Sequence, residues 1–211
     1  MKPGLFITFE GGEGGGKTTQ SALLRKALEQ EGFPVIHTRE PGGTEGAEQI
    51  RNLLVQGDAV TWEKMTELFL HFAARIEHVE KLLRPALAAG NIVICDRFVD
   101  STLSYQGYGH ELGAEIIQMM HSIAIGNFQP DVTFILDISP EKGVERANSR
   151  GGTDNRYEQM GKAFHARVRQ GFQEIARNNP GRCILLNAAN PIETIHNAIL
   201  QEVISRYKGC I

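Results

Sequence analysis

Residues 6–20 read FITFEGGEGGGKTTQ, and this stretch decides the fold class. Gly11, Gly16, Lys17 and Thr18 stand at the spacing Gly-x-x-x-x-Gly-Lys-Thr, which is the pattern of a phosphate-binding loop. An apolar, β-rich run precedes the pattern and a helix-forming run follows it, as the pattern requires. Because glycines let successive backbone N–H groups point at phosphate oxygens, and a helix N-terminus adds a favourable dipole, the stretch predicts a nucleotide site in an α/β domain.

The loop contains one residue that does not suit an anion site. Lys17 is expected to reach the β- and γ-phosphates, and the hydroxyl of Thr18 is expected to bind Mg²⁺. Glu13 instead places a carboxylate in the middle of the loop. The residues predicted to bind the phosphoryl donor are Gly11, Gly12, Glu13, Gly14, Gly15, Gly16, Lys17, Thr18 and Thr19.

Apolar runs and helical patterns alternate along the whole chain. We predict strands at 5–10, 34–38, 91–96, 131–138 and 182–187. We predict helices near 17–31, 46–56, 62–89, 111–126, 140–149, 156–178 and 191–207. Ser139-Pro140 and Asn190-Pro191 each place a capping side chain before a proline, which is typical of a helix start. Near-continuously apolar strands that alternate with helices indicate a parallel sheet covered on both faces, and we expect residues 1–211 to form one such α/β domain.

Composition argues against several classes of partner. The chain has 211 residues and a formal net charge of −3, which does not favour wholesale binding to nucleic acid or to a membrane. No apolar run approaches the length of a membrane span, and the apolar run at the N-terminus is too short for a secretory signal. Cys95, Cys183 and Cys210 are odd in number and form no Cys-x-x-Cys pair, so we expect a reducing, cytoplasmic compartment.

Charged residues follow the second predicted strand. Ligands of open α/β sheets bind at the carboxyl ends of the strands, so the stretch TREPGGT (38–44) places Arg39 and Glu40 near the phosphate loop. Its composition alone fits a polar turn equally well. Arg51, on the helix that follows, is either a ligand or a solvated helix charge.

Charged residues also follow the third predicted strand, in the stretch CDRFVDSTLSYQGYG (95–109). Asp96 is placed to hold Mg²⁺ through water, and Arg97 is placed to clamp a phosphate with two hydrogen bonds. The alternative is an Asp–Arg pair on the surface. The position of the pair at the carboxyl end of a strand favours the functional interpretation.

The stretch LFLHFAARIEHV (68–79) combines aromatic rings with an arginine on a predicted helix. His71 and Phe72 lie one helical turn before Arg75, so a ring and a guanidinium can share one face. Such a pair suits a planar base, because the ring stacks and the arginine donates to a carbonyl. A core phenylalanine beside a surface arginine is the alternative, and this stretch alone favours that alternative.

The motifs taken together resemble those of thymidylate kinase, which phosphorylates dTMP with ATP. The resemblance rests on FEGGEGGGKTTQ, TREPGGT, DRFVDSTLSYQGYG and the arginine-bearing segment near residue 150, in this order over nearly the whole chain. It implies the P-loop kinase fold, with helices wrapped around a five-stranded parallel sheet, a homodimer, and the use of ATP and Mg²⁺ in dTTP synthesis. Two alternatives stay open: another nucleoside monophosphate or deoxynucleoside kinase, and a P-loop ATPase that acts as a switch. The guanine-reading motif Asn-Lys-x-Asp is absent from the sequence, which disfavours a GTPase.

The resemblance implies roles for the residues that contact the phosphate and sugar of dTMP. Arg51 and Arg97 would clamp the phosphate, with Glu40 nearby. In this family an acid at the position of Glu13 contacts the 3′-hydroxyl of the deoxyribose, which accounts for a carboxylate in the loop. Tyr105 would crowd the 2′ position of the sugar.

The resemblance implies a second set of residues for the base. Arg75 and Gln106 would form hydrogen bonds with thymine, and Thr102 would lie beside them. The family's stacking phenylalanine falls on His71, with Phe72 adjacent, so either ring can be the one that stacks. The complete set of acceptor-binding residues is Glu13, Glu40, Arg51, His71, Phe72, Arg75, Arg97, Thr102, Tyr105 and Gln106.

One further arginine is expected from a lid. Gly14 stands where some family members carry an arginine inside the loop, and the chain resembles the bacterial subgroup whose lid supplies it. The segment 148–156, within a lid at about 146–157, holds Arg150 and Arg156, of which we prefer Arg150. No catalytic base is expected, because a phosphate acceptor with a second pKa of about 6 is largely ionised at neutral pH. The implied catalytic residues are Lys17, Arg97, Arg150 and Glu13.

Overall fold

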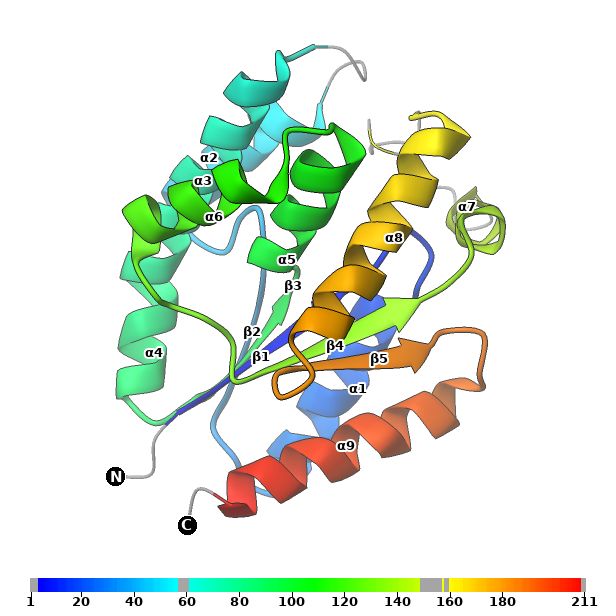
Figure 1. Ribbon diagram of the computed structural model, residues 1–211. Helices are drawn as coiled ribbons and strands as arrows, with labels where there is room; N and C mark the ends of the chain where they lie inside the picture. Colours follow the sequence, from blue (N-terminus) through cyan, green and yellow to red (C-terminus); the bar gives the residue numbers. More distant parts are fainter. Residues whose placement is uncertain (1–3, 57–60, 149–156, 158–159, 210–211) are drawn as a thin grey trace.

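A five-stranded, all-parallel sheet forms the centre of the molecule (Figure 1). The computed structural model describes residues 4–56, 61–148, 157 and 160–209. The strands are β1 (Leu5–Glu10), β2 (Val35–Arg39), β3 (Ile92–Asp96), β4 (Val132–Asp137) and β5 (Cys183–Asn187), and they lie in the order β2-β3-β1-β4-β5. Each strand matches a predicted strand to within about one residue at either end, so the predicted parallel sheet is confirmed.

Helices cover both faces of the sheet, as the alternating pattern predicts. The helices are α1 (Lys17–Gln30), α2 (Glu45–Val55), α3 (Lys64–His78), α4 (Arg84–Ala88), α5 (Val99–Thr102), α6 (Ala114–Ile125), α7 (Pro140–Asn148), α8 (Lys162–Asn178) and α9 (Ile192–Gly209). Two π-helical segments, η1 (Val79–Leu83) and η2 (Leu103–Gly109), continue α3 and α5. Figure 1 shows α1 and α9 on one face and the remaining large helices on the other. In the described part of the chain, no helix has the length and apolar character needed to cross a membrane.

The side chains of β1 alternate between two cores, because successive residues of a strand point to opposite faces. Leu5, Ile7 and Phe9 pack against α1 and α9 on one face. Phe6 packs on the other face, against η1, α4 and β3. A third cluster joins Ile135 of β4 to α8. Each fully buried side chain of this size contributes about 1.5–3 kcal/mol, so the cores hold the sheet and its helices together.

Residues 99–109 form a helical stretch, α5 and η2, that the sequence does not predict. The stretch lacks a clear helical period of apolar residues, and close packing against α8 stabilises it instead. A Cβ atom at Gly109 would lie 2.7 Å from the ring of Phe164, and one at Gly171 would lie 2.8 Å from the ring of Tyr108. Glycine at both contacts therefore allows the two helices to approach closely. Segments of π-helix are frequent at functional sites, and this one carries two predicted site residues.

The strands β2, β3 and β1 end at the same edge of the sheet. Asp96, the last residue of β3, is level with Phe9 of β1 on one side and with Arg39 of β2 on the other. The phosphate loop follows β1, Arg97 follows β3, and Glu40 follows β2. The topology therefore brings these three segments together, although they are far apart in the sequence.

Candidate active site

The phosphate loop, residues 11–16, links β1 to the N-terminus of α1. The side chain of Lys17 is buried, and its Nζ atom donates hydrogen bonds to the carbonyl oxygens of Gly11 at 3.1 Å and Gly12 at 2.9 Å. Burial lowers the pKa of Lys17, and the nearby charge of Arg97 lowers it further. The ammonium group thus lies against its own loop, within the anion site that the backbone forms.

The two residues predicted to bind Mg²⁺ lie in contact. The hydroxyl of Thr18 donates a hydrogen bond of 2.8 Å to Oδ2 of Asp96. A hydroxyl and a carboxylate oxygen at this place suit Mg²⁺, which takes oxygen ligands and usually keeps several waters and substrate phosphates as its other ligands. Within residues 4–56, 61–148, 157 and 160–209, no group of three or more His, Cys, Asp or Glu side chains is placed to hold a metal ion. The oxygens of Thr18 and Asp96 therefore fit a Mg²⁺ that takes its other ligands from water and from the phosphates of a nucleotide.

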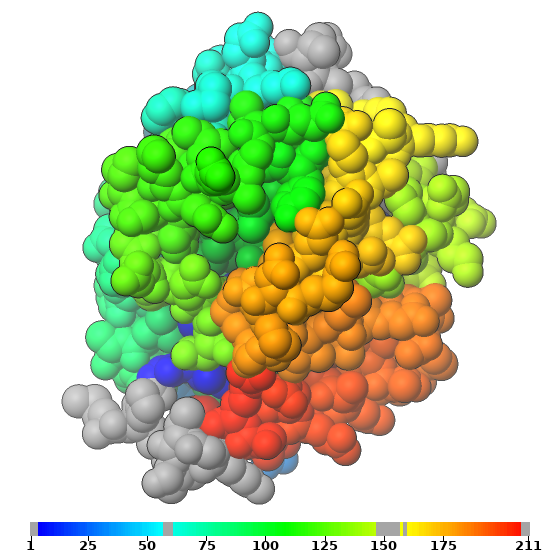
Figure 2. All heavy atoms as spheres, in the orientation of Figure 1, coloured from blue at the N-terminus to red at the C-terminus, as the bar shows by residue number. Residues whose placement is uncertain are grey.

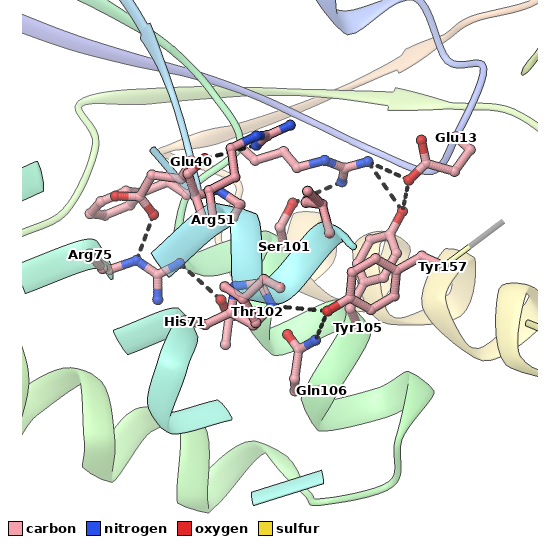
Figure 3. A pocket seen from close by; sticks show the side chains of 15 residues that line it. Glu13, Glu40, Arg51, His71, Arg75, Ser101, Thr102, Tyr105, Gln106 and Tyr157 are labelled. Carbon is pink, nitrogen blue, oxygen red and sulfur yellow. Dashed lines mark hydrogen bonds and ion pairs between the residues drawn. The ribbon is translucent and has the colours of Figure 1, made fainter. Parts of the chain in front are cut away.

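Glu13 points away from the loop toward Arg97 and Tyr105 (Figure 3). Its Oε1 atom accepts hydrogen bonds from Nη2 of Arg97 at 2.7 Å and from the hydroxyl of Tyr105 at 3.0 Å. Burial favours the neutral acid, but Arg97 and Lys17 outweigh burial and lower the pKa of Glu13 to about 2. Burial also raises the pKa of Tyr105, so its hydroxyl keeps the proton that it donates. Glu13 is therefore an ionised, fixed side chain at neutral pH.

Arg97 is held in an unusual backbone conformation. Its φ of 71° lies in the left-handed region, which is uncommon for a residue with a side chain. Its N–H donates to the carbonyl of Phe9 at 3.0 Å, and its Nη1 atom donates to Ser101 Oγ at 3.1 Å. Ser101 in turn donates to Oε2 of the buried Glu10 at 2.5 Å. Such strain persists only where surrounding contacts determine it, and here the contacts direct the guanidinium into the site.

Gly14 cannot be replaced by arginine in this backbone. Its φ is 68°, and a Cβ atom at this position would collide with the carbonyl oxygen of Gly143 in α7. A Cβ atom at Gly143 would likewise lie 2.5 Å from the carbonyl oxygen of Glu13. The loop and α7 therefore pack backbone against backbone, which gives a physical reason why the loop carries no arginine at this position.

A pocket with a cavity volume of about 330 Å³ opens beside the loop (Figure 3). It runs from Glu13 and Arg97 at one end to His71, Gln106 and Tyr157 at the other. The pocket brings together nine of the ten predicted acceptor residues, which are Glu13, Glu40, Arg51, His71, Arg75, Arg97, Thr102, Tyr105 and Gln106.

Phe72 is the predicted acceptor residue that does not line the pocket. It is 2% exposed and packs in a core cluster with Leu68 and Ile117, with Cζ of Arg75 at 5.0 Å from its ring centre. Neighbouring residues of a helix point about 100° apart, so His71 and Phe72 cannot face the same space. The structure places His71 in the pocket and Phe72 in the core beneath Arg75.

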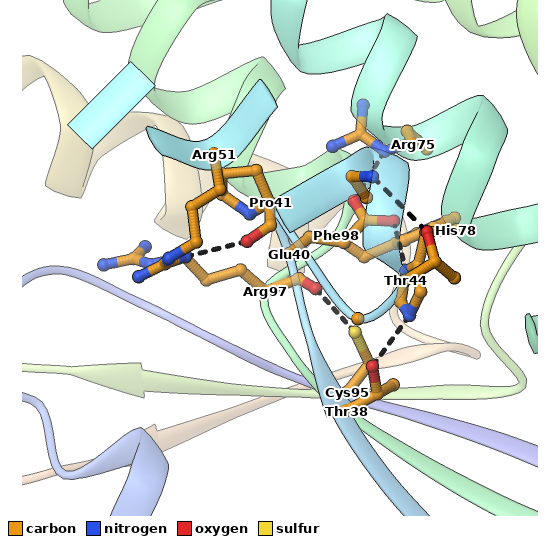
Figure 4. A network of polar contacts seen from close by, with 12 residues as sticks. Thr38, Glu40, Pro41, Thr44, Arg51, Arg75, His78, Cys95, Arg97 and Phe98 are labelled. Atoms are coloured by element: carbon orange, nitrogen blue, oxygen red, sulfur yellow. Dashed lines mark hydrogen bonds and ion pairs between the residues drawn. The ribbon is translucent and has the colours of Figure 1, made fainter. Parts of the chain in front are cut away.

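Arg75 is anchored by a buried network at the base of the pocket (Figure 4). Its Nε atom donates to Oε2 of Glu40 at 2.8 Å, and its Nη2 atom donates to the hydroxyl of Thr102 at 2.9 Å. The other carboxylate oxygen of Glu40 lies 2.9 Å from Nδ1 of His78. Burial raises the pKa of Glu40, but Arg75 and His78 outweigh burial and lower it overall. Glu40 thus fixes Arg75, whose Nη1 atom has no hydrogen-bond partner among the described residues.

A second cavity of about 580 Å³ lies over the phosphate loop and adjoins the pocket. The two cavities share Glu13, Glu40, Arg51 and Arg97 in their linings. Arg51 reaches this border from α2, where its Nη1 atom donates to the carbonyl oxygen of Pro41 at 2.8 Å (Figure 4). Arg39 lines the second cavity but forms a surface ion pair with Glu48 at 3.0 Å. Both cavities therefore meet at a border of two arginines and two carboxylates.

Some pocket residues are not predicted from the sequence. Tyr157 and Ser101 line the pocket, and Glu67 forms hydrogen bonds with Tyr157 and Gln106 behind it. The one sequence signal for Glu67 is its position one helical turn before His71. No local pattern places Tyr157, which reaches the pocket only through the fold. The predicted lid residues Arg150 and Arg156 lie outside the described residues.

The fold and the two cavities together define a class of protein. A phosphate loop that ends in Lys17 and Thr18 faces a separate pocket lined with arginines and large enough for one nucleotide. The two cavities meet at charged side chains, where the phosphates of two bound nucleotides would approach each other. This is the arrangement of a P-loop nucleoside monophosphate kinase.

The family model described as thymidylate kinase matches residues 9–199, so the chain belongs to the thymidylate kinase family, whose members phosphorylate dTMP to dTDP using ATP. The chain is 47% identical to the thymidylate kinase of Caulobacter vibrioides over 206 residues, which cover 98% of this chain and 99% of that protein. It is 50% identical to the thymidylate kinase of Synechococcus sp. (strain JA-3-3Ab) over 190 residues, or 90% of each chain. The crystal structure of thymidylate kinase from Ehrlichia chaffeensis superposes with a TM-score of 0.78 at 38% identity and covers 95% of this chain and 98% of that one. The family predicted from the motifs is confirmed.

Proposed function

We propose that this chain transfers the γ-phosphoryl group of ATP directly to the phosphate of dTMP, as a step in dTTP synthesis. The observation that carries the proposal is the shared border of the two cavities at Glu13, Glu40, Arg51 and Arg97. A donor over the phosphate loop and an acceptor in the pocket would present their phosphates to each other at this border. The experiment that tests the proposal is dTDP formation from ATP and dTMP, with dUMP, dCMP and dAMP as competing acceptors.

The transfer needs no side chain that removes a proton. The second pKa of a phosphate monoester is about 6, so an acceptor oxygen is already largely ionised at neutral pH. This oxygen attacks the γ-phosphorus of ATP, the bond from that phosphorus to the bridging oxygen breaks, and ADP leaves with the electron pair. The barrier is the approach of two anions. Arg51 and Arg97 at the border and Lys17 in the cavity over the loop are the cations that would offset it.

The sugar would lie between the phosphate border and the base. Glu13 is ionised and within the pocket lining, so its carboxylate can accept a hydrogen bond from the 3′-hydroxyl. The ring of Tyr105 lies under the guanidinium of Arg97, with the Cζ atom 5.0 Å from the ring centre. A ring fixed in this way would crowd a 2′-hydroxyl, which favours a deoxyribonucleotide.

The base end of the pocket offers one donor and one acceptor. Nη1 of Arg75 and Oε1 of Gln106 are buried and have no hydrogen-bond partner among the described residues. Thymine presents a carbonyl oxygen at O4 and an N–H group at N3, which match a donor and an acceptor. His71, which lines the same end of the pocket, would stack on the ring.

Mg²⁺ would be held by the hydroxyl of Thr18 and, through water, by the carboxylate of Asp96, which lie 2.8 Å apart. When bound, the ion neutralises charge on the donor phosphates and orients them. The contact between the two side chains supports this assignment, because both oxygens are fixed at the mouth of the loop.

The lid would add the last cation. Because Gly14 cannot carry a side chain in this backbone, an arginine near the transferring group must come from another segment. Arg150, which lies outside the described residues, is our candidate, and Arg156 is the alternative. An arginine in this role is worth ~10³ or more in rate in P-loop enzymes.

A second copy of this chain would cover the outer side of α3 and α6. Phe69 of α3 is 59% exposed and Ile123 of α6 is 79% exposed, and Ile76 and Met119 are exposed beside them on the same two helices. The helix α6 lies at the surface of the face seen in Figure 2. The helices α3 and α6 are in contact, and exposed large apolar side chains on neighbouring helices favour an interface, which homodimers bury symmetrically. We place this homodimer in the cytoplasm, since Cys95 and Cys183 are free and buried.

A further inference from the structure

A buried cluster of hydrogen bonds lies behind the base end of the pocket. Its centre is Glu67 of α3, which is 1% exposed and does not line the pocket. Oε1 of Glu67 accepts a hydrogen bond of 2.7 Å from Nε2 of Gln106 and one of 2.8 Å from the hydroxyl of Tyr157. The same hydroxyl lies 3.3 Å from Nε2 of Gln106 and 3.0 Å from Nε2 of His71. Figure 3 shows Gln106 and Tyr157 joined at this end of the pocket.

The directions of these hydrogen bonds follow from the chemistry of the groups. Oε1 of Glu67 accepts from both neighbours, so Gln106 turns its NH₂ group, and not its carbonyl, toward Glu67. The Tyr157 hydroxyl donates its proton to Glu67, so its oxygen is left to accept a hydrogen bond from the NH₂ group of Gln106. A flip of the Gln106 amide would place its oxygen where Nε2 now lies, 2.7 Å from a carboxylate oxygen. Two acceptors at that distance repel each other, so the flip is strongly unfavourable.

The orientation of the Gln106 amide decides which of its atoms is left for a ligand. With its NH₂ group turned toward Glu67, Gln106 presents Oε1 as a buried acceptor that no described residue satisfies. Glu40 and Thr102 fix Arg75 in the same manner, and Nη1 of Arg75 is a buried donor without a partner in the described part of the chain. Buried polar atoms without partners are rare in folded proteins and cost free energy. Both residues line the pocket, so these two atoms are the candidates to meet a complementary donor and acceptor of a ligand.

We propose that Glu67 is a positioning residue that sets base specificity: its carboxylate orients the Gln106 amide so that the pocket accepts thymine and rejects cytosine. The proposal rests on the proposed function, in which Gln106 and Arg75 face the base. Thymine offers N3–H to the Gln106 oxygen and O4 to Arg75. Cytosine has a bare N3 atom and an NH₂ group at C4, so it would set acceptor against acceptor and donor against donor.

The experiment compares kcat/KM for dTMP and for dCMP, with ATP as donor, in the wild type and in Glu67→Gln. The new amide can donate as well as accept, so Gln106 becomes free to present its NH₂ group to the pocket. We expect the dTMP-to-dCMP ratio of kcat/KM to fall by about tenfold or more. Part of this fall should come from a higher kcat/KM for dCMP. An unchanged ratio in the folded variant overturns the proposal.

A control variant separates orientation from general damage. Asp100→Asn removes the charge of another buried carboxylate, which pairs with Arg182 at 2.6 Å and does not line the pocket. We expect this variant to keep the wild-type ratio. A ratio lost in Asp100→Asn as completely as in Glu67→Gln would contradict a specific role for Glu67.

A measurement on the wild type serves if Glu67→Gln does not fold. The side-chain N–H protons of Gln106, assigned by the absence of their resonances in Gln106→Leu, should show nuclear Overhauser contacts to Tyr157 and none to bound dTMP, because they face Glu67. Strong contacts to the base would mean that the NH₂ group faces dTMP and would overturn the proposal. If the wild type uses dTMP and dCMP equally well, the proposed base site itself is wrong. If the wild type prefers dTMP and Glu67→Gln keeps the same preference, only the role of Glu67 is wrong.

Discussion

Nη2 of Arg97 lies 2.7 Å from Oε1 of Glu13, and this ion pair joins the residue after β3 to the phosphate loop after β1. The pair lies on the border between the two cavities, where both residues are part of the lining. The pKa of Glu13, lowered to about 2 against the effect of burial, keeps the carboxylate charged and directed toward Arg97. A carboxylate can therefore stand in an anion-binding loop, because the backbone binds the donor and the side chain faces the acceptor.

Glu13→Ala should impair the use of dTMP much more than the binding of ATP. The variant removes an acceptor for the sugar hydroxyl and leaves Arg97 without its partner at 2.7 Å. Hydrogen bonds to charged groups are worth about 1.5–3 kcal/mol, so kcat/KM for dTMP should fall ~10- to 100-fold. Steady-state kinetics with each substrate varied in turn check this expectation. The control is Glu29→Ala, which removes a surface carboxylate paired with Arg25 at 2.8 Å and lines neither cavity. Equal losses of both affinities in Glu13→Ala would mean that Glu13 only supports the loop.

His71→Ala should weaken dTMP binding with little loss of stability, whereas Phe72→Ala should mainly lower the stability of the fold. His71 lines the pocket, so its loss should raise KM for dTMP by about 3- to 10-fold, the worth of one aromatic stack, with little change in Tm. Phe72 is a core residue, so its loss should cost about 3–5 kcal/mol of stability. Thermal melts and dTMP titrations of both variants separate the two effects. A stable Phe72→Ala with a specific defect in dTMP binding would reverse the assignment.

Glu10→Gln tests the buried acid that holds Ser101 behind Arg97. Burial and the charge of Asp100 raise the pKa of Glu10 from 4.5 to about 8. The folded chain therefore keeps a proton that the unfolded chain releases, and the stability that this provides is lost as the pH rises from 4.5 to about 8. Over this range, the Tm of the wild type should fall relative to that of Glu10→Gln, whose amide mimics the protonated acid. Paired melts that keep a constant gap over this range would contradict the raised pKa.

Arg150→Ala should lower kcat strongly, by ~10³, with little change in dTMP affinity. That combination is the signature of an interaction made mainly in the transition state. Arg156→Ala serves as the matched control, because it removes the same charge from the same segment and should do less. Normal turnover in Arg150→Ala with a crippled Arg156→Ala would exchange the two roles, and normal turnover in both would refute the lid proposal.

Local sequence patterns predict the sheet and many of the residues that line the pocket. The five apolar runs predict the strands, of which β1, β3 and β4 are buried along nearly their whole length. Ligands of a parallel sheet gather at the carboxyl ends of its strands. Arg97 is predicted in this way from its position, whereas the stretch that holds Glu40 fits a polar turn equally well and the family resemblance supplies the role of Glu40. Helix periodicity does not predict α5 and η2, since their glycines and polar residues fold through contact with α8.

The remaining parts of the site depend on contacts over long distances in the chain. The sequence places His71 and Phe72 side by side, and only the packing of α3 decides which of them faces the pocket. Glu67 and Tyr157 lie 90 residues apart and meet through a single hydrogen bond of 2.8 Å. No spacing in the sequence predicts this contact, because Glu67 and Tyr157 meet only once the fold has brought α3 and the segment before α8 together.

We infer that one site transfers the phosphoryl group of ATP to dTMP and recognises the thymine base. The most direct test is the rate of nucleoside diphosphate formation from ATP with dTMP, dUMP, dCMP and dAMP. The structure predicts dTDP as the main product, and it predicts weak use of dCMP and dAMP because their base edges do not match Arg75 Nη1 and Gln106 Oε1. ATP hydrolysis without dTDP, or equal rates with all four acceptors, would contradict the account.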